Sequence, residues 1–288
     1  MLNESLKLLF VMLLWGGTFI SGRILSQSLS SFDISFLRFF IASFILLCFS
    51  KNEFKYFSIL NIKDYLILLL LGVLGIFSYN FFFFSGLKTV EASKASVIIA
   101  SNPTLTVLLA SLFLNEKFTF KKLLGVVIAL FGVLTVITKF NYLSLVTIGL
   151  GQGEIYLFCA ALSWVLYSLL GKIILRKVSA LFANTMAIVI GTFLLFPFSS
   201  MSFNTFYQIP FISWLHLIYL GALGTSVGFI LYYQGIQKIG ASKAASFINF
   251  VPIFGVSFGF FFLNETIHVS LFIGLVNVIL GVYLISKR

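Results

Sequence analysis

The chain has 288 residues, of which 60% are hydrophobic and only 9% are charged. One soluble core could not hide that much apolar surface, so the composition excludes an ordinary soluble protein and indicates a lipid environment. The net charge of +11 comes from 19 Lys and Arg against 8 Asp and Glu. These basic residues are spread over short loops and form no compact basic domain, which argues against a nucleic-acid partner and favours contact with the lipid bilayer.

Ten apolar stretches follow one another along the chain, each long enough for a bilayer. A helix needs about 20 mostly apolar residues to cross roughly 30 Å of hydrocarbon. The expected helices are 6–25, 33–50, 65–84, 92–113, 121–138, 154–175, 179–198, 211–233, 241–263 and 269–286. A β-barrel is the other spanning architecture, but these stretches are continuous apolar runs and are too long for barrel strands. We therefore predict an all-α integral membrane protein with ten transmembrane helices.

Rare residue types recur at a fixed separation of 149 positions, which indicates an internal duplication. The motif Ala-Ser-Lys-Ala occupies 92–95 and 241–244, and Leu-Asn-Glu occupies 114–116 and 263–265. Single residues that match in the same way are Trp15 and Trp164, Pro103 and Pro252, Gly125 and Gly274, and Gly132 and Gly281. We therefore predict a first five-helix repeat at 1–140, a connecting loop at 141–153 and a second five-helix repeat at 154–288, a pattern typical of transporters.

An odd number of helices per repeat makes the second copy enter the membrane from the opposite side, so the two repeats should be inverted. The distribution of Lys and Arg tests the orientation, because these residues accumulate in cytoplasmic loops. With the N-terminus inside, 14 of the 19 basic residues fall on the cytoplasmic side. The remaining five are Arg23, Arg38, Lys88, Lys94 and Lys139. We expect a multi-pass protein of the bacterial inner (plasma) membrane with both termini cytoplasmic.

Trp15 and Trp164 fall at the centres of their expected helices, whereas tryptophan in membrane proteins usually lies at the interface. Two repeat-related indoles at mid-depth favour the lining of a central cavity, where a ring can stack on a substrate and donate a hydrogen bond. The alternative is that they are large packing residues between helices.

Pro103 and Pro252 also occupy the middles of their expected helices. A proline there removes the hydrogen bond to the carbonyl four residues earlier and bends the helix. Free carbonyls at mid-depth are tolerated where protein or a water-filled cavity satisfies them, as at transporter binding sites. Asn102 and Asn249 lie close to these bends, so we predict kinks with amides beside a site. A kink that serves packing alone is the alternative.

Two further helices combine close-packing glycines with polar aromatic residues. The glycines of 72–75 and 221–224 are expected to let neighbouring helices approach each other. Tyr79, Asn80, Tyr232 and Tyr233 follow them along the same helices, at a depth that suits a gate or the rim of a site. Tyrosine near a helix end can equally belong to the interfacial belt.

Ionisable residues inside the expected helices are few, and they are candidates for function because their burial is costly. Arg38 could attract an anionic substrate group such as a carboxylate, or it could snorkel to the surface. Glu116 and Glu265 end their helices and are expected to cap the following helix or to pair with loop lysines. Since no Asp or Glu falls near the centre of a predicted helix, facilitated diffusion or exchange is favoured over proton antiport.

Catalytic and metal-binding patterns are missing from the sequence. Cys48 and Cys159 lie inside expected helices without metal-type spacing, so we interpret them as small core residues. We find no paired carboxylates and no Ser/His arrangement at matched depth. We therefore predict neither an enzyme nor a cofactor or metal site.

The repeated motifs resemble those of a known family. The segment Gly86–Val136 carries Ala-Ser-Lys-Ala, a central proline, Leu-Phe-Leu-Asn-Glu and two glycines seven positions apart, and Gly235–Ile285 carries the same pattern. With Trp15-Gly16 in the first helix, the chain resembles the EamA-type permeases of the drug/metabolite transporter superfamily. Val165 and Leu166 stand in the second copy where Gly16 and Gly17 stand in the first, so the halves need not contribute equally.

This resemblance implies ten helices, cytoplasmic termini and a central cavity between the two halves. The cavity would be lined mainly by the first, third, fourth, sixth, eighth and ninth helices. By position and chemistry, the substrate-binding candidates on these helices are Trp15, Tyr79, Asn80, Asn102, Trp164, Tyr167, Tyr232 and Asn249.

We therefore predict a secondary transporter that works by alternating access around a central mid-membrane cavity. Its aromatic, weakly charged lining suits a small zwitterion or neutral metabolite, and export of amino acids or related compounds is the first hypothesis. Uptake of a nucleoside-like or adenosyl metabolite and efflux of toxic amphiphiles are alternatives. A non-transporting membrane scaffold or sensor is a further alternative, because fold does not fix activity. The sequence leaves the oligomeric state open, a monomer included.

Overall fold

The computed structural model describes residues 2–113, 119–144, 149–200, 203–239, 244 and 247–286. Throughout these ranges the regular structure is helical and no β-strand occurs, which confirms the all-α prediction. The prediction for Glu116 lies outside the described residues, as does most of the second Ala-Ser-Lys-Ala motif at 241–244.

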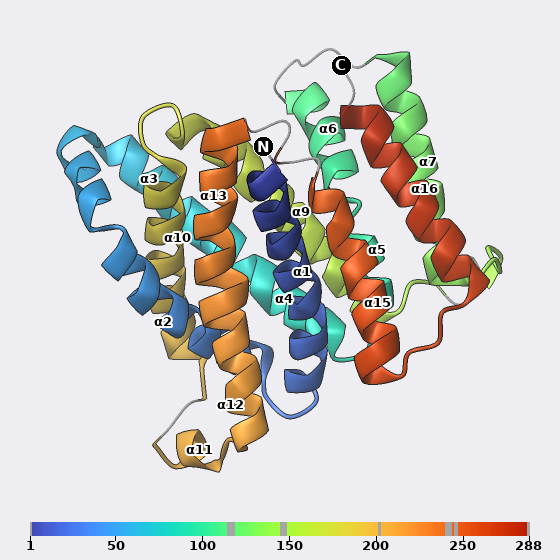
Figure 1. Cartoon of the computed structure of the whole chain (residues 1–288), viewed down its shortest axis with the longest axis horizontal. Helices are drawn as coiled ribbons and strands as arrows, with labels where there is room; N and C mark the ends of the chain where they lie inside the picture. The colour runs from blue at the N-terminus through green and yellow to red at the C-terminus, as the bar shows by residue number, and fades with distance from the viewer. Residues whose placement is uncertain are drawn as a thin grey trace.

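The first half of the chain forms a helical bundle with short connections (Figure 1). Its elements are α1 (Leu2–Leu25), α2 (Ser31–Phe49), η1 (Lys51–Ile59), α3 (Ile62–Leu71), η2 (Gly72–Ser78), α4 (Tyr79–Leu87), α5 (Ala92–Ile99), α6 (Asn102–Phe113) and α7 (Phe120–Thr138). Side-chain caps fix several starts. Ser30 accepts a hydrogen bond from the backbone N–H of Asp33 at the start of α2, and Asn61 forms a reciprocal capping box with Asp64 at the start of α3.

The second half continues the bundle. Its elements are α9 (Gln152–Ile174), α10 (Ala180–Leu195), η3 (Phe196–Phe198), α11 (Phe203–Gln208), α12 (Phe211–Ile218), η4 (Tyr219–Val227), α13 (Gly228–Ile239), η5 (Ile248–Phe250), α15 (Val251–Leu263) and α16 (Val269–Ser286). Ser179 caps the start of α10.

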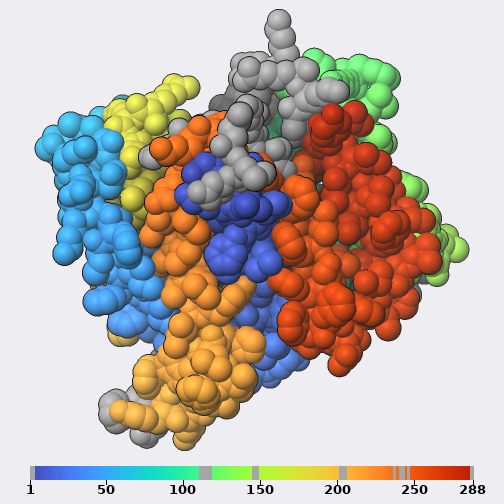
Figure 2. Space-filling view, in the orientation of Figure 1, coloured from blue at the N-terminus to red at the C-terminus, as the bar shows by residue number. Residues whose placement is uncertain are grey.

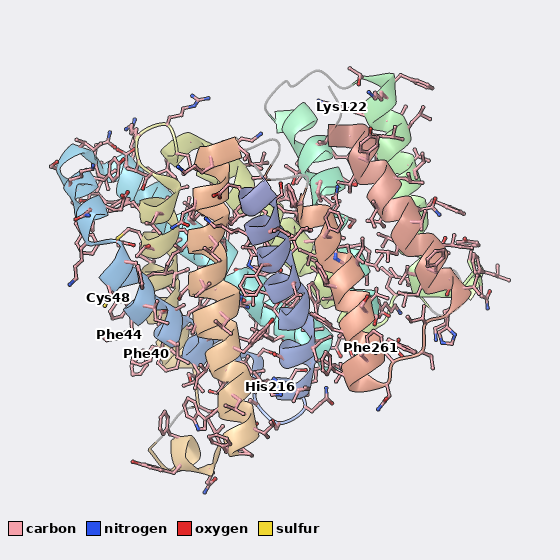
Figure 3. The ribbon with its side chains drawn as sticks, in the orientation of Figure 1. Phe40, Phe44, Cys48, Lys122, His216 and Phe261 are labelled. Atoms are coloured by element: carbon pink, nitrogen blue, oxygen red, sulfur yellow. The ribbon has the colours of Figure 1, made fainter. Side chains whose placement is uncertain are left out.

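Seven of the described helical segments are long and apolar enough to cross a membrane, and 248–263 and 269–285 are shorter apolar helices. Large apolar side chains also cover the outside of the bundle. Phe40, Phe44 and Phe261 point outward and are 59%, 73% and 72% exposed (Figure 3). Such an apolar exterior is unfavourable in water and favourable in lipid, so the chain is a multi-pass membrane protein.

The expected helix 92–113 is interrupted. α5 ends at Ile99, and α6 begins at Asn102 with Pro103 as its second residue. Pro252 is likewise the second residue of α15, after the short turn η5. Proline lacks a backbone N–H and is accommodated in the first turn of a helix, which explains why a new helix starts at each position.

Two π-helical segments, η2 and η4, widen the helices that contain the paired glycines. Polar side chains bind the backbone carbonyls of these wide turns. The Asn80 Nδ2 donates to the Gly75 and Ile76 carbonyls at 3.2 and 3.0 Å, and the Thr225 hydroxyl donates to the Leu220 carbonyl at 2.7 Å. The sequence-based prediction of regular helices over 65–84 and 211–233 missed these bulges, which are often found at functional sites.

Close packing between glycines joins the two halves at one edge of the bundle. α7 and α16 run antiparallel there (Figure 1). Gly125 faces the backbone of Gly281, and Gly132 faces the backbone of Gly274. Glycine permits this approach because a Cβ at either site would overlap the facing backbone. In the middle of the face that Figure 2 shows, α1 packs between α13 and α15.

Candidate functional site

Arg38 lies at the centre of a polar cluster inside the bundle. Its Nε donates to Thr225 Oγ1 at 3.0 Å, and its Nη1 donates to Asn80 Oδ1 at 3.2 Å. The guanidinium also lies over the rings of Phe39 and Phe84, with distances of 5.0 and 6.0 Å to the ring centroids. The structure therefore does not support the alternative in which Arg38 snorkels to the surface.

The three members of this cluster come from different parts of the chain. α2 carries Arg38, the start of α4 carries Asn80, and η4 carries Thr225. The amide of Asn80 is oriented by η2, since its Nδ2 donates to two backbone carbonyls and its Oδ1 is left to accept from Arg38. Within the described ranges no carboxylate lies within ion-pairing distance of Arg38. The guanidinium has five N–H donors, and two of them are used here.

An aromatic cluster lies beside this polar group. The ring of Tyr79 contacts the indole of Trp164 with a centroid separation of 5.2 Å, and Trp164 contacts Tyr167 at 5.3 Å. The Tyr167 hydroxyl donates to Asn184 Oδ1 at 3.3 Å. The indole N–H of Trp164 has no hydrogen-bond partner in the part of the chain that is described.

Trp15 has a different environment. Its Nε1 donates to the Gly224 carbonyl at 3.0 Å, and its ring contacts Tyr232 and Phe229 at 5.1 and 5.7 Å. Because the indole N–H is already bound to backbone, Trp15 is not placed to donate to a substrate as expected. Tyr233, next to Tyr232, stacks on Phe229 with a centroid separation of 6.0 Å.

Among the described residues, the side chains of Asn102 and Asn249 form no hydrogen bond with these clusters. Asn102 is 8% exposed at the start of α6, and its Oδ1 is buried without a partner. Asn249 is half-buried in η5. The structure thus brings Asn80 to Arg38 and joins Tyr79, Trp164 and Tyr167 in one aromatic cluster. It pairs Trp15 with Tyr232 beside Gly224, and it leaves the two asparagines beside the proline breaks.

The contacts of Glu265 differ from those that we expected. We expected it to cap the helix that follows or to pair with loop lysines, but its carboxylate accepts from the backbone N–H groups of Ala92 and Ser93 at 2.7 and 2.9 Å, and from the Ser93 hydroxyl. These groups form the start of α5 in the other half, where a carboxylate satisfies free N–H groups and the helix dipole. The next residue of α5, Lys94, forms an ion pair with Glu154 of α9 at 2.5 Å.

Sequence reasoning missed Thr225 and Asn184. Thr225 directly follows the glycine pair at 221–224, so a hydroxyl after a close-packed glycine could have indicated a polar turn inside the membrane. Tyr233 was assigned to a gate or rim but not to the site. In the described residues no group of three or more His, Cys, Asp or Glu side chains could hold a metal ion.

A model of the EamA-like transporter family matches the chain twice, at residues 4–138 and 151–287. The chain belongs to this family. An uncharacterized transporter of Bacillus subtilis, YyaM, is 31% identical to this EamA-family protein over 98% of the chain and 92% of its own length. YoaV, an uncharacterized transporter of the same organism, is 28% identical over 99% and 97% of the two chains.

Two other comparisons concern the substrate and the fold. A protein of Streptantibioticus cattleyicolor named a probable terminal-alkyne amino-acid exporter is 25% identical over 78% of this EamA-family chain and 74% of its own. A solved crystal structure matches the fold with a TM-score of 0.63 at 16% sequence identity, covering 98% of this chain and 96% of that one.

Proposed function

We propose that this EamA-family protein is a secondary transporter that exports amino acids or related carboxylate-bearing metabolites by alternating access. The half-buried side chain of Arg38 carries this proposal, because its guanidinium is held by two neutral oxygens and by no carboxylate in the described residues. A substrate carboxylate would supply the missing negative charge and accept from the remaining N–H donors. The exporter of S. cattleyicolor supports the same substrate class.

The aromatic groups would bind the rest of the substrate. Trp164, Tyr79 and Tyr167 offer ring faces next to Arg38, and the free indole N–H of Trp164 can donate to a polar atom. A ligand that combines a carboxylate with a partly apolar body fits this combination. A purely cationic amphiphile would be repelled by Arg38.

We propose that the chain consists of two inverted five-helix repeats, at 1–140 and 154–288 with the connection 141–153. Contacts in the structure support a pseudo-two-fold relation between the halves. Where a residue of the first half contacts a residue of the second, the equivalent residues, 149 positions away, contact each other in the reverse order. The exchanged contacts are Gly72 with Ile190 and Gly221 with Ile41, Gly75 with Tyr167 and Gly224 with Thr18, Gly86 with Leu157 and Gly235 with Leu8, and Gly125 with Gly281 and Gly132 with Gly274.

One further contact supports the position of the axis. The hydroxyls of Ser43 and Thr192 are 3.0 Å apart, and these two residues are themselves 149 positions apart. Equivalent residues can touch each other only where the axis passes. An axis between α2 and α10 implies ten transmembrane helices with both termini on one side, which we place in the cytoplasm by the charge distribution of the loops.

Alternating access requires contacts that close one face at a time. We propose that the hydrogen bonds between Glu265 and the start of α5 are one such closing contact, since they join the end of α15 to the opposite half. We propose that the substrate moves by exchange or facilitated diffusion and not by proton antiport.

The decisive experiment is counterflow in proteoliposomes with labelled amino acids, adenosyl metabolites and amphiphilic cations. We expect amino acids to exchange and the cations not to. Exchange of adenosyl metabolites alone would overturn the substrate proposal while keeping transport. Failure of every compound to move, together with co-purification of a partner protein, would favour the scaffold alternative.

A further inference from the structure

α4 has two faces of different character. Asn80, Phe84 and Leu87 are buried toward the bundle, whereas Phe81, Ser85 and Lys88 lie on the outward face at helical spacing. Along this outward face the chemistry changes in order, from an aromatic ring to a hydroxyl to an ammonium group at the helix end. With a rise of about 1.5 Å per residue, the change from ring to ammonium takes about 10 Å along the helix axis.

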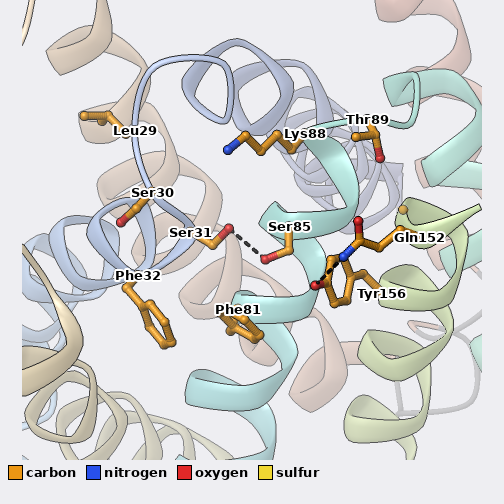
Figure 4. A pocket seen from close by; sticks show the side chains of 11 residues that line it. Leu29, Ser30, Ser31, Phe32, Phe81, Ser85, Lys88, Thr89, Gln152 and Tyr156 are labelled. Carbon is orange, nitrogen blue, oxygen red and sulfur yellow. Dashed lines mark hydrogen bonds between the residues drawn. The ribbon is translucent and has the colours of Figure 1, made fainter.

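A cavity of about 350 Å³ lies over this face (Figure 4). The starts of α2 and α9 form its walls, and its principal lining residues are Ser31, Phe32, Phe81, Ser85, Lys88 and Tyr156. The aromatic rings lie on one side of the cavity and Lys88 lies on the other (Figure 4). The cavity is separate from the Arg38 cluster, because none of the residues that line it belongs to that cluster.

The aromatic side is preformed. The rings of Phe32 and Phe81 stack with a centroid separation of 4.6 Å, and Phe81 meets Tyr156 edge-on at 6.3 Å. The polar side holds the hydroxyl pair of Ser31 and Ser85, whose oxygens are 2.9 Å apart. An apolar part of a ligand would therefore contact the aromatic rings, and a polar part nearer to Lys88 would contact the hydroxyls.

Among the residues that line the cavity, Lys88 alone carries a charge, and this charge is positive. Lys88 is exposed and makes no ion pair with any described residue. The acidic residues nearest in the two wall helices are engaged elsewhere. Asp33 accepts hydrogen bonds from Ser30, Ser199 and Ser200, and the carboxylate of Glu154 is paired with Lys94.

We propose that this cavity binds one anionic phospholipid from the membrane leaflet at the end of α4. The acyl chain would lie along Phe81, the glycerol ester region would lie at the Ser31 and Ser85 hydroxyls, and the phosphate would meet the Lys88 ammonium. Lys88 is exposed at the edge of the cavity, so a membrane component can reach the cavity from the surface of the bundle without passing through the protein. The site is independent of which substrate the protein transports.

Native mass spectrometry of the full-length protein in detergent tests the site. The probes are phosphatidylglycerol, phosphatidylcholine with the same acyl chains, and glycerol 3-phosphate. We expect one phosphatidylglycerol to be retained over phosphatidylcholine by about fivefold, the ratio that one basic residue near anionic lipid provides. Lys88→Gln should remove this preference. Lys139→Gln, which removes an exposed lysine at the end of α7, should leave it unchanged.

A second variant tests the cavity independently of charge. Ser85→Phe would fill the space between Phe81 and Lys88 and should reduce retention of both phospholipids. An unchanged unfolding midpoint without lipid would show that each variant folds. The proposal is overturned if Lys88→Gln keeps the phosphatidylglycerol preference. It is also overturned if glycerol 3-phosphate displaces the lipid at equal concentration, because the site would then bind a soluble phosphate.

Discussion

Arg38 combines the properties of a binding residue and of a structural residue, and substitutions can separate the two. Arg38→Gln should lower counterflow of a carboxylate-bearing amino acid at least tenfold, because the charge that meets the carboxylate is lost. It should also lower the free energy of unfolding by about 1–3 kcal/mol, since the oxygens of Asn80 and Thr225 lose a buried donor. Arg38→Lys should recover part of the transport, as a charge without the planar fork.

Lys139→Gln is the matched control for Arg38→Gln, because it removes a positive charge from an exposed position. We expect unchanged counterflow in this variant. Equal transport by wild type and Arg38→Gln, measured at substrate concentrations below saturation, would remove Arg38 from the binding site.

The two repeat-related tryptophans should respond differently to substitution by Phe. Trp15→Phe removes the hydrogen bond to Gly224 and should destabilise the protein by about 0.5–1.5 kcal/mol with a modest effect on transport. Trp164→Phe removes an N–H that has no partner among the described residues, so it should lower transport severalfold with little change in the unfolding midpoint. Thermal unfolding and counterflow on the same preparations measure both, and the reverse pattern would contradict these assignments.

For single residues, the sequence indicated which side chains are candidates for function but not which residues they contact. Trp15, Trp164 and Arg38 stood out because their types are rare inside a membrane helix. Their partners could not be predicted, because Arg38 and Thr225 are 187 positions apart and their contact depends on helix packing. In the sequence, nothing distinguishes Thr225 from the other Ser and Thr residues, and its role depends on the fold, which places it beside the Arg38 guanidinium.

At the scale of helices, apolar length and proline position predicted most of the described segments to within a few residues. The starts of α7 and α16, at Phe120 and Val269, lie within one residue of the sequence prediction. The π-helical segments were missed because a widened turn leaves the apolar composition unchanged. Its signal is polar side chains placed to bind the freed carbonyls, as Asn80 and Thr225 do.

The packing of α7 against α16 allows a direct test of close approach. A Cβ added at Gly132 would come within 2.7 Å of the Gly274 carbonyl oxygen. Gly132→Ala should therefore force the helices apart and lower the free energy of unfolding by about 1–3 kcal/mol. Gly171→Ala is the matched control, because a Cβ there meets no atom within 4 Å and should be neutral or stabilising. Equal unfolding midpoints for the two variants would contradict the packing argument.

At the scale of the whole molecule, the duplicated sequence predicted which segments correspond but not where the two halves touch. Contacts on the proposed axis and contacts far from it should affect alternating access differently. The Ser43 and Thr192 hydroxyls meet at the proposed axis, 3.0 Å apart. A disulfide formed in Ser43→Cys/Thr192→Cys joins the halves where they move least during a rocking motion. We expect transport to continue after oxidation, in a background with Cys48→Ala and Cys159→Ala.

The contact between Glu265 and Ala92 lies away from the axis and closes one face, so a link there should have the opposite effect. A short bis-methanethiosulfonate, which links two thiols through disulfide bonds, should stop counterflow when it is applied to Ala92→Cys/Glu265→Cys. Cleaving the link with reductant should restore it. Because both links join the same two halves, a difference between them reports on the motion and not on folding. Arrest by the axial disulfide, or unimpeded transport with the Ala92–Glu265 link in place, would contradict rocking of the halves about this axis.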